Sequence, residues 1–188
     1  APGVGGVDLS AGLSLGASFT NVPGGTANWT FAGGTNYNDA SGSVAIVITK
    51  ATANVSVAGY TGIFDAAGHG ATGSATGVGG VALPGLDLGA TFTGVPGGTA
   101  SWSFAGGTNY NDASGSVAIV ITKATANITV SGYTGIYDGA AHGATGTATG
   151  VGGVNLGGSL ALGATFTGVP GGTANWTFTG GTNYNDAS

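Results

Sequence analysis

The sequence contains no cysteine, methionine, arginine or glutamate among its 188 residues. Without cysteine there is no disulfide framework and no thiol nucleophile, and without either sulfur-containing residue there is little for oxidants to attack. Two lysines, Lys50 and Lys123, stand against seven aspartates, which gives a net charge of −5. Binding to a phosphate backbone requires clustered lysine and arginine side chains, so the charge pattern excludes nucleic acid as a partner.

Long apolar runs are also missing. No run approaches the roughly 18 apolar residues of a membrane-spanning helix, so no membrane span is expected within these residues. The chain instead combines 42 glycines with 41% apolar residues. Disordered chains have low hydrophobicity and high net charge, and collagen has glycine at every third position. Because this sequence has neither pattern, we expect it to fold around an apolar core.

The strongest feature is an internal repeat with a period of 73 to 74 residues. A period of this size is typical of a string of small domains, and the near identity of the copies indicates recent duplication. The recurring features are Trp29, Trp102 and Trp176; the segment Gly-Gly-Thr-Asn-Tyr-Asn-Asp-Ala-Ser at 33–41, 106–114 and 180–188; and the segment Ser-Val-Ala-Ile-Val-Ile-Thr-Lys at 43–50 and 116–123.

The repeat predicts three units, of which only residues 51–123 form a complete one. Residues 1–50 begin at a position equivalent to about Ala75, so this partial repeat lacks the opening strands. Residues 124–188 end before their copy of the closing strand. An incomplete sandwich leaves unpaired edges and half of its core in water. We therefore expect these residues to be a window of a longer tandem array.

Within residues 51–123 the apolar side chains alternate with polar ones, which predicts strands with one core face. Glycine- and proline-rich segments such as Val95-Pro96-Gly97-Gly98 separate these runs, and no segment has helical spacing. Six or seven short strands with frequent turns predict an all-β fold, a small antiparallel sandwich in each unit. The expected core positions are Val55, Val57, Leu88, Ala90, Phe92, Ala100, Trp102, Phe104, Val117, Ile119 and Ile121.

The order of motifs resembles a known family. Tyr-Thr-Gly-Ile-Tyr-Asp-Gly is followed by Val-Pro-Gly-Gly-Thr-Ala-x-Trp, Gly-Gly-Thr-Asn-Tyr-Asn-Asp and Ala-Ile-Val-Ile-Thr-Lys-Ala. This order is similar to the bacterial immunoglobulin-like, mostly-beta glycine-rich repeats of large surface proteins, and the resemblance covers the whole chain. It implies secretion, tandem immunoglobulin-like β-sandwiches and stacking in adhesins or cell-surface fibres. It implies no catalytic residues.

These observations favour a structural protein over an enzyme. Lys50-Ala51-Thr52-Ala53 leads directly from one unit to the next without a flexible linker, as in a fibre, stalk or surface array. The expected location is extracellular or at the cell surface, and the expected partners are neighbouring repeats or other copies of the chain. The alternative is an adhesin module that binds a cell-surface glycan through tryptophan. Alternation places each tryptophan on the core face beside phenylalanine, which favours the structural interpretation.

Few residues are candidates for chemistry. Asn109, Asn111 and Asp112 offer oxygen ligands for calcium, and the alternative is an Asx turn that caps the local backbone. His69 and His142 occupy one repeat position without the partners that zinc requires, so a turn histidine is favoured. No unit combines a nucleophile, a base and an orienting group, and no cofactor is expected.

Three further possibilities remain open. The two lysines are candidates for isopeptide crosslinks. The alternative is that each is a solvated strand end beside the junction between two units. A Thr-x-Thr-x-Thr run at 145–149 has the row of hydroxyl groups that an ice-binding face needs. The same pattern is typical of an ordinary exposed strand, and of a small-residue face that packs against a neighbouring sheet. Glycans could occupy the four Asn-x-Ser/Thr sequences, at Asn28, Asn54, Asn127 and Asn175.

The last repeat should need a further strand. Its tryptophan and phenylalanine, Trp176 and Phe178, are equivalent to residues that the segment 115–123 is expected to cover in the complete repeat. We expect a segment of the Ser-Val-Ala-Ile-Val-Ile-Thr type to cover them, supplied by the continuing chain or by a neighbour.

Overall fold

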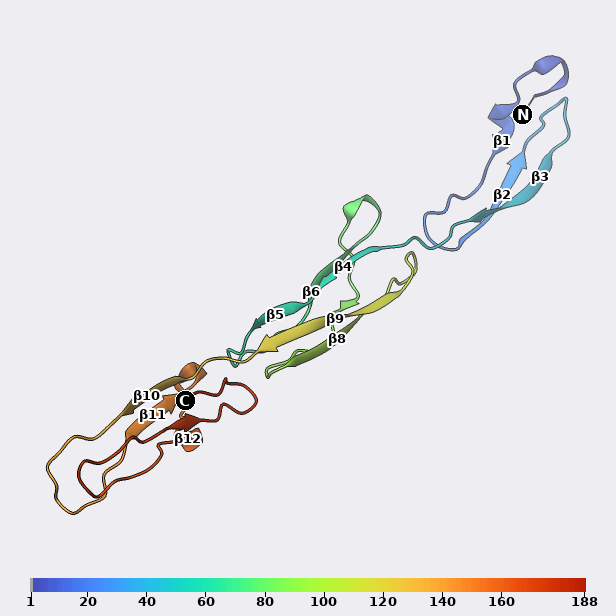
Figure 1. Cartoon of the computed structure of the whole chain (residues 1–188). Helices are drawn as coiled ribbons and strands as arrows, with labels where there is room; N and C mark the ends of the chain where they lie inside the picture. Colours follow the sequence, from blue (N-terminus) through green and yellow to red (C-terminus); the bar gives the residue numbers. More distant parts are fainter. Residues whose placement is uncertain (1) are drawn as a thin grey trace. The chain divides into compact units, whose positions relative to one another are not determined.

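The computed structural model describes residues 2–188 of the chain. These residues form an all-β structure with several small sheets, as the alternating pattern predicts (Figure 1). In this described part of the chain, helical turns are limited to 3-10 segments of three residues each: η1 Val4–Gly6, η2 Ser10–Gly12, η3 Val78–Gly80, η4 Val151–Gly153 and η5 Gly157–Ser159. Across residues 2–188, no helix has the length and apolar character needed to cross a lipid bilayer.

The contacts divide the chain into two compact units. The first consists of the N-terminal segment up to Val55 together with Ala75–Gly85 and Phe104–Ala113. The second consists of Ser56–Ser74, Leu86–Ser103 and Ser114–Ser188. Each unit thus contains residues from more than one of the predicted repeats. The repeat boundaries after Lys50 and Lys123 remain a prediction.

The first unit contains a three-stranded sheet in the order β1-β2-β3, formed by Leu13–Ser14, Gly24–Phe31 and Ala40–Val47. Its pairs are antiparallel, with Trp29 opposite Gly42 in the β2–β3 register. The indole of Trp29 lies so close to Gly42 that a Cβ at this position would collide with the ring. Glycine at this strand position therefore makes room for the tryptophan.

The middle of the chain forms a four-stranded sheet in the order β5-β9-β8-β7 (Figure 1). These strands are β5 Tyr60–Ile63, β9 Ala113–Thr122, β8 Gly97–Phe104 and β7 Leu86–Asp87. β9 is parallel to β5, with Tyr60 opposite Ile119, and has β8 as its other neighbour. A separate pair is formed by β4 Asn54–Ala58 and β6 Thr72–Thr76.

The C-terminal third forms two separate two-stranded sheets. β10 Asn127–Ser131 pairs antiparallel with β11 Thr145–Thr149, and β12 Leu160–Ala161 pairs antiparallel with β13 Thr177–Phe178. A buried cluster joins Phe178 and Tyr184 with three alanines, Ala124, Ala126 and Ala148.

The core of the four-stranded sheet follows the predicted alternation. Ala100, Phe104, Ile119 and Ile121 are buried, while the residues that alternate with them, Ser101, Ser103 and Val120, are exposed. Trp102 and Phe92, which we expected in the same core, are only half-buried. The indole of Trp102 lies against Gly115, and because glycine has no side chain, it covers the ring less than a larger residue would.

The alternation of Leu88, Ala90 and Phe92 predicts a strand at this point, but β7 ends at Asp87. Oδ1 of Asp87 accepts a hydrogen bond of 2.9 Å from the amide of Gly89, and Gly89 has a φ of 77°. This Asx turn and left-handed glycine end the strand. Phe92 resumes pairing through an isolated bridge to His69.

Candidate functional site

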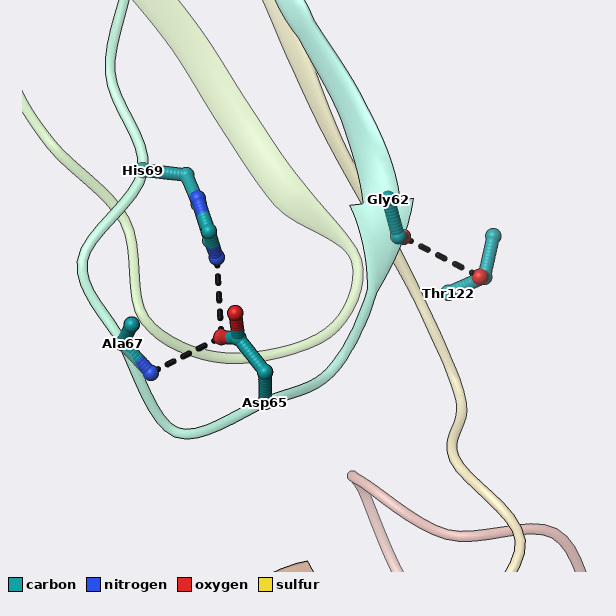
Figure 2. Close-up of polar contacts among 5 residues, drawn as sticks. All are labelled: Gly62, Asp65, Ala67, His69 and Thr122. Carbon is teal, nitrogen blue, oxygen red and sulfur yellow. Dashed lines mark hydrogen bonds and ion pairs between the residues drawn. The ribbon is translucent and has the colours of Figure 1, made fainter.

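The first candidate site is the turn at His69, which Figure 2 shows in close-up. Nε2 of His69 lies 2.8 Å from Oδ1 of Asp65, and the same oxygen accepts a 2.9 Å hydrogen bond from the amide of Ala67. The imidazole stacks on Tyr60, with ring centroids 3.9 Å apart and an interplanar angle of 6°. The backbone of His69 also pairs with Phe92 in both directions.

These contacts use both the ring face and the Nε2 edge of the histidine. The hydrogen bond from His69 is the main cause that lowers the pKa of Asp65, and the amide of Ala67 adds to it. Tyr133, Asp138 and His142 repeat the arrangement, with the rings 3.8 Å apart. The geometry is that of an anchored turn. Within residues 2–188, no group of three or more histidine or acidic side chains is placed to hold a metal ion.

The second candidate is the Gly-Gly-Thr-Asn-Tyr-Asn-Asp loop that contains the calcium candidates. Oδ1 of Asp112 accepts a 2.8 Å hydrogen bond from the amide of Gly106, which closes the loop on itself. The hydroxyl of Tyr110 accepts a 3.0 Å hydrogen bond from the amide of Val78. Asp39 and Asp186 make the same bond to Gly33 and Gly180. Each carboxylate caps an amide six residues earlier, so these bonds close the loop but are not Asx turns, which join a side chain to the amide two residues later. Calcium binding remains a prediction.

Asn109 connects this loop to residues of the preceding repeat. Its Oδ1 accepts a 3.0 Å hydrogen bond from the amide of Val22, and its Nδ2 donates a 2.8 Å bond to Oδ1 of Asn21. The backbone adds a parallel bridge, in which Ala51 donates to the carbonyl of Asn109 and accepts from the amide of Asn111, both at 2.9 Å. One loop thus holds a turn of the preceding repeat through the Asn109 side chain and the first residue of its own repeat through the backbone bridge.

The third copy of the loop makes most of the same contacts. We call the contacts between one of these loops and the preceding repeat a joint. Oδ1 of Asn183 accepts a 3.1 Å hydrogen bond from the amide of Val95. Ala124 donates to the carbonyl of Asn183 at 2.9 Å and accepts from the amide of Asn185 at 2.8 Å. The bond between two asparagine side chains is absent here, because Gly94 occupies the position of Asn21.

Both lysines take part in these joints. Nζ of Lys50 donates a 2.7 Å hydrogen bond to the carbonyl of Gly107, and Nζ of Lys123 donates a 2.6 Å bond to the carbonyl of Gly181. Each acceptor lies in the Gly-Gly-Thr-Asn-Tyr-Asn-Asp loop of the following repeat. Both ammonium groups therefore lie at the junctions between sequence repeats, which is where the strand-end interpretation of these lysines places them.

An aromatic contact adds to the second joint. The rings of Phe64 and Tyr184 meet edge to face, with centroids 5.6 Å apart and an interplanar angle of 79°. Tyr184 belongs to the buried cluster, and Phe64 is among the half-buried residues packed against it. Edge-to-face pairs of this kind contribute about 0.5–1.5 kcal/mol beyond the burial of their area.

Sequence analysis singled out Asn109 and its repeats, but it did not predict that their side chains bind the preceding repeat. We interpreted the asparagines as turn formers or calcium ligands, since both roles are satisfied within a loop. Their contacts reach segments far away in the sequence, which no local pattern encodes. The exact repetition of the loop was the available signal. Comparisons with protein-family models, curated proteins and solved structures found no match for this chain.

Proposed function

We propose that this chain is a structural protein of the cell surface or extracellular space, built from tandem immunoglobulin-like sandwiches with a period of 73 to 74 residues. The observation that carries the proposal is the repeated joint. Asn109 and Asn183 each accept a hydrogen bond from a valine amide of the preceding repeat. The lysine before each repeat boundary donates a further bond to the loop of the following repeat. A module built to stack on its own copies is what a fibre, stalk or surface array requires.

The chemistry of the joint suits this role. Its bonds involve a lysine ammonium together with backbone groups and asparagine amides, and the last two kinds of group carry no titratable proton in the ordinary pH range. The repeat also lacks cysteine and methionine, so it offers little for oxidants outside a cell to attack. Both properties favour a lasting structural role in an exposed setting.

The resemblance to mostly-beta glycine-rich repeats supports the same function. In that family, sandwiches follow one another in large secreted proteins, and the joint described above supplies a physical reason for tandem order here. The alternative is an adhesin whose units bind glycan through Trp29, Trp102 and Trp176. That role requires an indole face that a sugar can reach. Trp102 is half-buried against Gly115, so less of its ring is accessible to a sugar than in a fully exposed tryptophan.

Electron microscopy of the native material tests the proposal directly. An antibody against this chain should label continuous strings, sheets or filaments at the surface of the producing cells. Label dispersed in the medium, without any ordered assembly, would contradict a structural role. Glycan titration followed by tryptophan fluorescence tests the alternative, since an adhesin would show a saturable spectral shift and a structural array would show none.

A further inference from the structure

The chain contains two lysines and no arginine, and each lysine stands directly before a predicted repeat boundary. Trypsin-like serine proteases bind a lysine or arginine side chain in an acidic pocket and cut the peptide bond that follows it. Lys50–Ala51 and Lys123–Ala124 are therefore the bonds that such a protease would recognise in this sequence. Residues 48–53 and 121–126 are both Ile-Thr-Lys-Ala-Thr-Ala, so the two bonds have the same local chemistry.

The residue after the second of these bonds is held by the last loop of its own repeat. The amide of Ala124 donates a 2.9 Å hydrogen bond to the carbonyl of Asn183, and the carbonyl of Ala124 accepts a 2.8 Å bond from the amide of Asn185. Ala124 is 5% exposed and belongs to the same buried cluster as Tyr184. Both of its backbone groups are therefore paired and shielded from solvent.

The residue before Lys123 is held by the preceding repeat. The carbonyl of Thr122 accepts a 2.8 Å hydrogen bond from the amide of Phe64. The hydroxyl of Thr122 donates a 3.1 Å bond to the carbonyl of Gly62, as Figure 2 shows. Phe64 also contacts Tyr184 of the following repeat edge to face. Lys123 thus stands between two residues whose backbones are fixed, one in each repeat.

Asn183 connects this arrangement to the joint. Its backbone carbonyl holds the amide of Ala124, while its side chain accepts the amide of Val95 from the preceding repeat at 3.1 Å. Nζ of Lys123 donates a 2.6 Å bond to the carbonyl of Gly181 in the same loop. The loop therefore contacts residues on both sides of the peptide bond between Lys123 and Ala124.

The first boundary is built in the same way. Ala51 donates to the carbonyl of Asn109 and accepts from the amide of Asn111, both at 2.9 Å. Nζ of Lys50 donates a 2.7 Å bond to the carbonyl of Gly107. The side chain of Asn109 holds the amide of the preceding repeat's valine, as that of Asn183 does at the second boundary.

A protease needs the backbone of its substrate as well as the lysine side chain. It binds the chain as an extended strand, and main-chain hydrogen bonds hold that strand in the active site. Lys123 is exposed, so access to its side chain alone does not protect the bond. The paired backbones of Thr122 and Ala124 do protect it, because their donors and acceptors are occupied while the joint is closed.

We infer that the peptide bonds after Lys50 and Lys123 are cleavage sites for a trypsin-like serine protease, and that the closed joints mask them. Hydrolysis breaks the bond between the lysine carbonyl carbon and the alanine nitrogen. Water supplies the hydroxyl of the new lysine carboxyl group and a proton for the new alanine amine. The protease reaches the bond in those molecules whose joint is open, so the equilibrium of joint opening sets the rate of cleavage.

A cut at either site falls between predicted repeats and leaves the strands on both sides whole. β9, for example, ends at Thr122, before the bond that is cut. In an array under tension, an opened joint would be cut and a closed one would stay protected, so whole repeats would be released. This biological use rests on the structural function proposed above. Masking of the two bonds is a property of the chain that can be measured by itself.

Digestion of the full chain with trypsin tests the inference, with each cut assigned from the masses of its fragments. The peptide Ile-Thr-Lys-Ala-Thr-Ala gives the rate for an unprotected bond, and the native chain should be cut at least about tenfold more slowly. Asn183→Ala removes a bond of the second joint, so it should speed cleavage at Lys123 by about two- to tenfold and leave Lys50 unchanged. Asn109→Ala is the matched control and should have the reverse effect.

A strengthened joint provides a variant whose result misfolding cannot imitate. A Cβ at Gly94 would lie 3.5 Å from Oδ1 of Asn183, so Gly94→Asn can add a bond to the second joint and should slow cleavage at Lys123. Cleavage of the native chain at the rate of the peptide would overturn the inference. An Asn183→Ala effect that is equal at both lysines, or absent at Lys123, would overturn the role of the joint. Assembly of the native material, which tests the proposed function, is measured independently of these rates.

Discussion

The side chain of Asn109 accepts a hydrogen bond from the amide of Val22, a residue 87 positions earlier in the chain. Asn183 makes the equivalent bond to Val95, across 88 positions. Both asparagines lie in copies of one loop. Its shape is fixed by internal bonds that the amides of Gly106 and Gly180 donate to Asp112 and Asp186 respectively. The loop is a preorganised surface that binds the Val-Pro-Gly-Gly turn of the preceding repeat.

Asn109→Ala should destabilise the first joint. It removes a part-buried acceptor of the Val22 amide and the bond to Asn21, so we expect a loss of about 0.5–1.5 kcal/mol for each bond. Urea unfolding of the full chain measures this loss. Asn111→Ala is the matched control, because its backbone bond to Ala51 remains. Equal effects of the two substitutions would contradict the role given to the Asn109 side chain.

Gly94→Asn should strengthen the second joint. A Cβ at Gly94 would lie 3.5 Å from Oδ1 of Asn183, an ordinary contact distance. The new amide would then take the place that Asn21 has beside Asn109. We expect a gain of about 0.5–1 kcal/mol in the free energy of unfolding. If the gain persists in the combined variant Gly94→Asn, Asn183→Ala, it does not come from this pairing.

The half-burial of Trp102 predicts a graded response in the core. Phe104→Ala removes a side chain that is 2% exposed, so it should cost about 3–5 kcal/mol. Trp102→Ala should cost less, about 2 kcal/mol, because solvent already reaches part of the indole. Chemical denaturation of both variants gives the comparison. A larger cost for Trp102 than for Phe104 would mean that the indole is a central core group.

Acid should weaken the turns at Asp65 and Asp138. The pKa of each carboxyl is lowered from 3.8, chiefly by the histidine hydrogen bond. A carboxyl with a lowered folded-state pKa contributes stability that is present above 3.8 and is lost as the pH falls through the folded-state value. Unfolding measured from neutral to strongly acidic pH should show this loss.

Two variants control the acid experiment. The double substitution Asp65→Asn, Asp138→Asn should flatten the acid limb of the stability profile. His69→Phe keeps an aromatic ring beside Tyr60 and removes the hydrogen bond, so it should reduce the acid dependence contributed by Asp65. An unchanged acid limb in the double variant would show that other groups cause the loss.

Much of the strand pattern could be predicted from the sequence. The alternation of Ala100, Trp102 and Phe104 placed β8, and the Val-Ala-Ile-Val-Ile-Thr run placed most of β9, because period-two patterning is local. The break after Asp87 was missed. An Asx turn beside a glycine competes with the strand there, and alternation alone does not reveal which of them prevails.

The joints could not be predicted in the same way. Asparagine satisfies a local turn and a distant amide with the same atoms, so its identity does not tell which one it binds. The stacking of His69 on Tyr60 likewise depends on how β5 and the following turn come together. Local composition favoured a turn histidine, but it contained no signal for the stacked tyrosine.

Amide hydrogen exchange at the joints tests the central claim most directly. The joint amides are those of Val22 and Val95, which donate the bonds that cross from one sequence repeat to the next. If successive repeats are held by these bonds, the joint amides should exchange nearly as slowly as those of β9. Exchange as fast as in the exposed segment 131–140 would contradict the account.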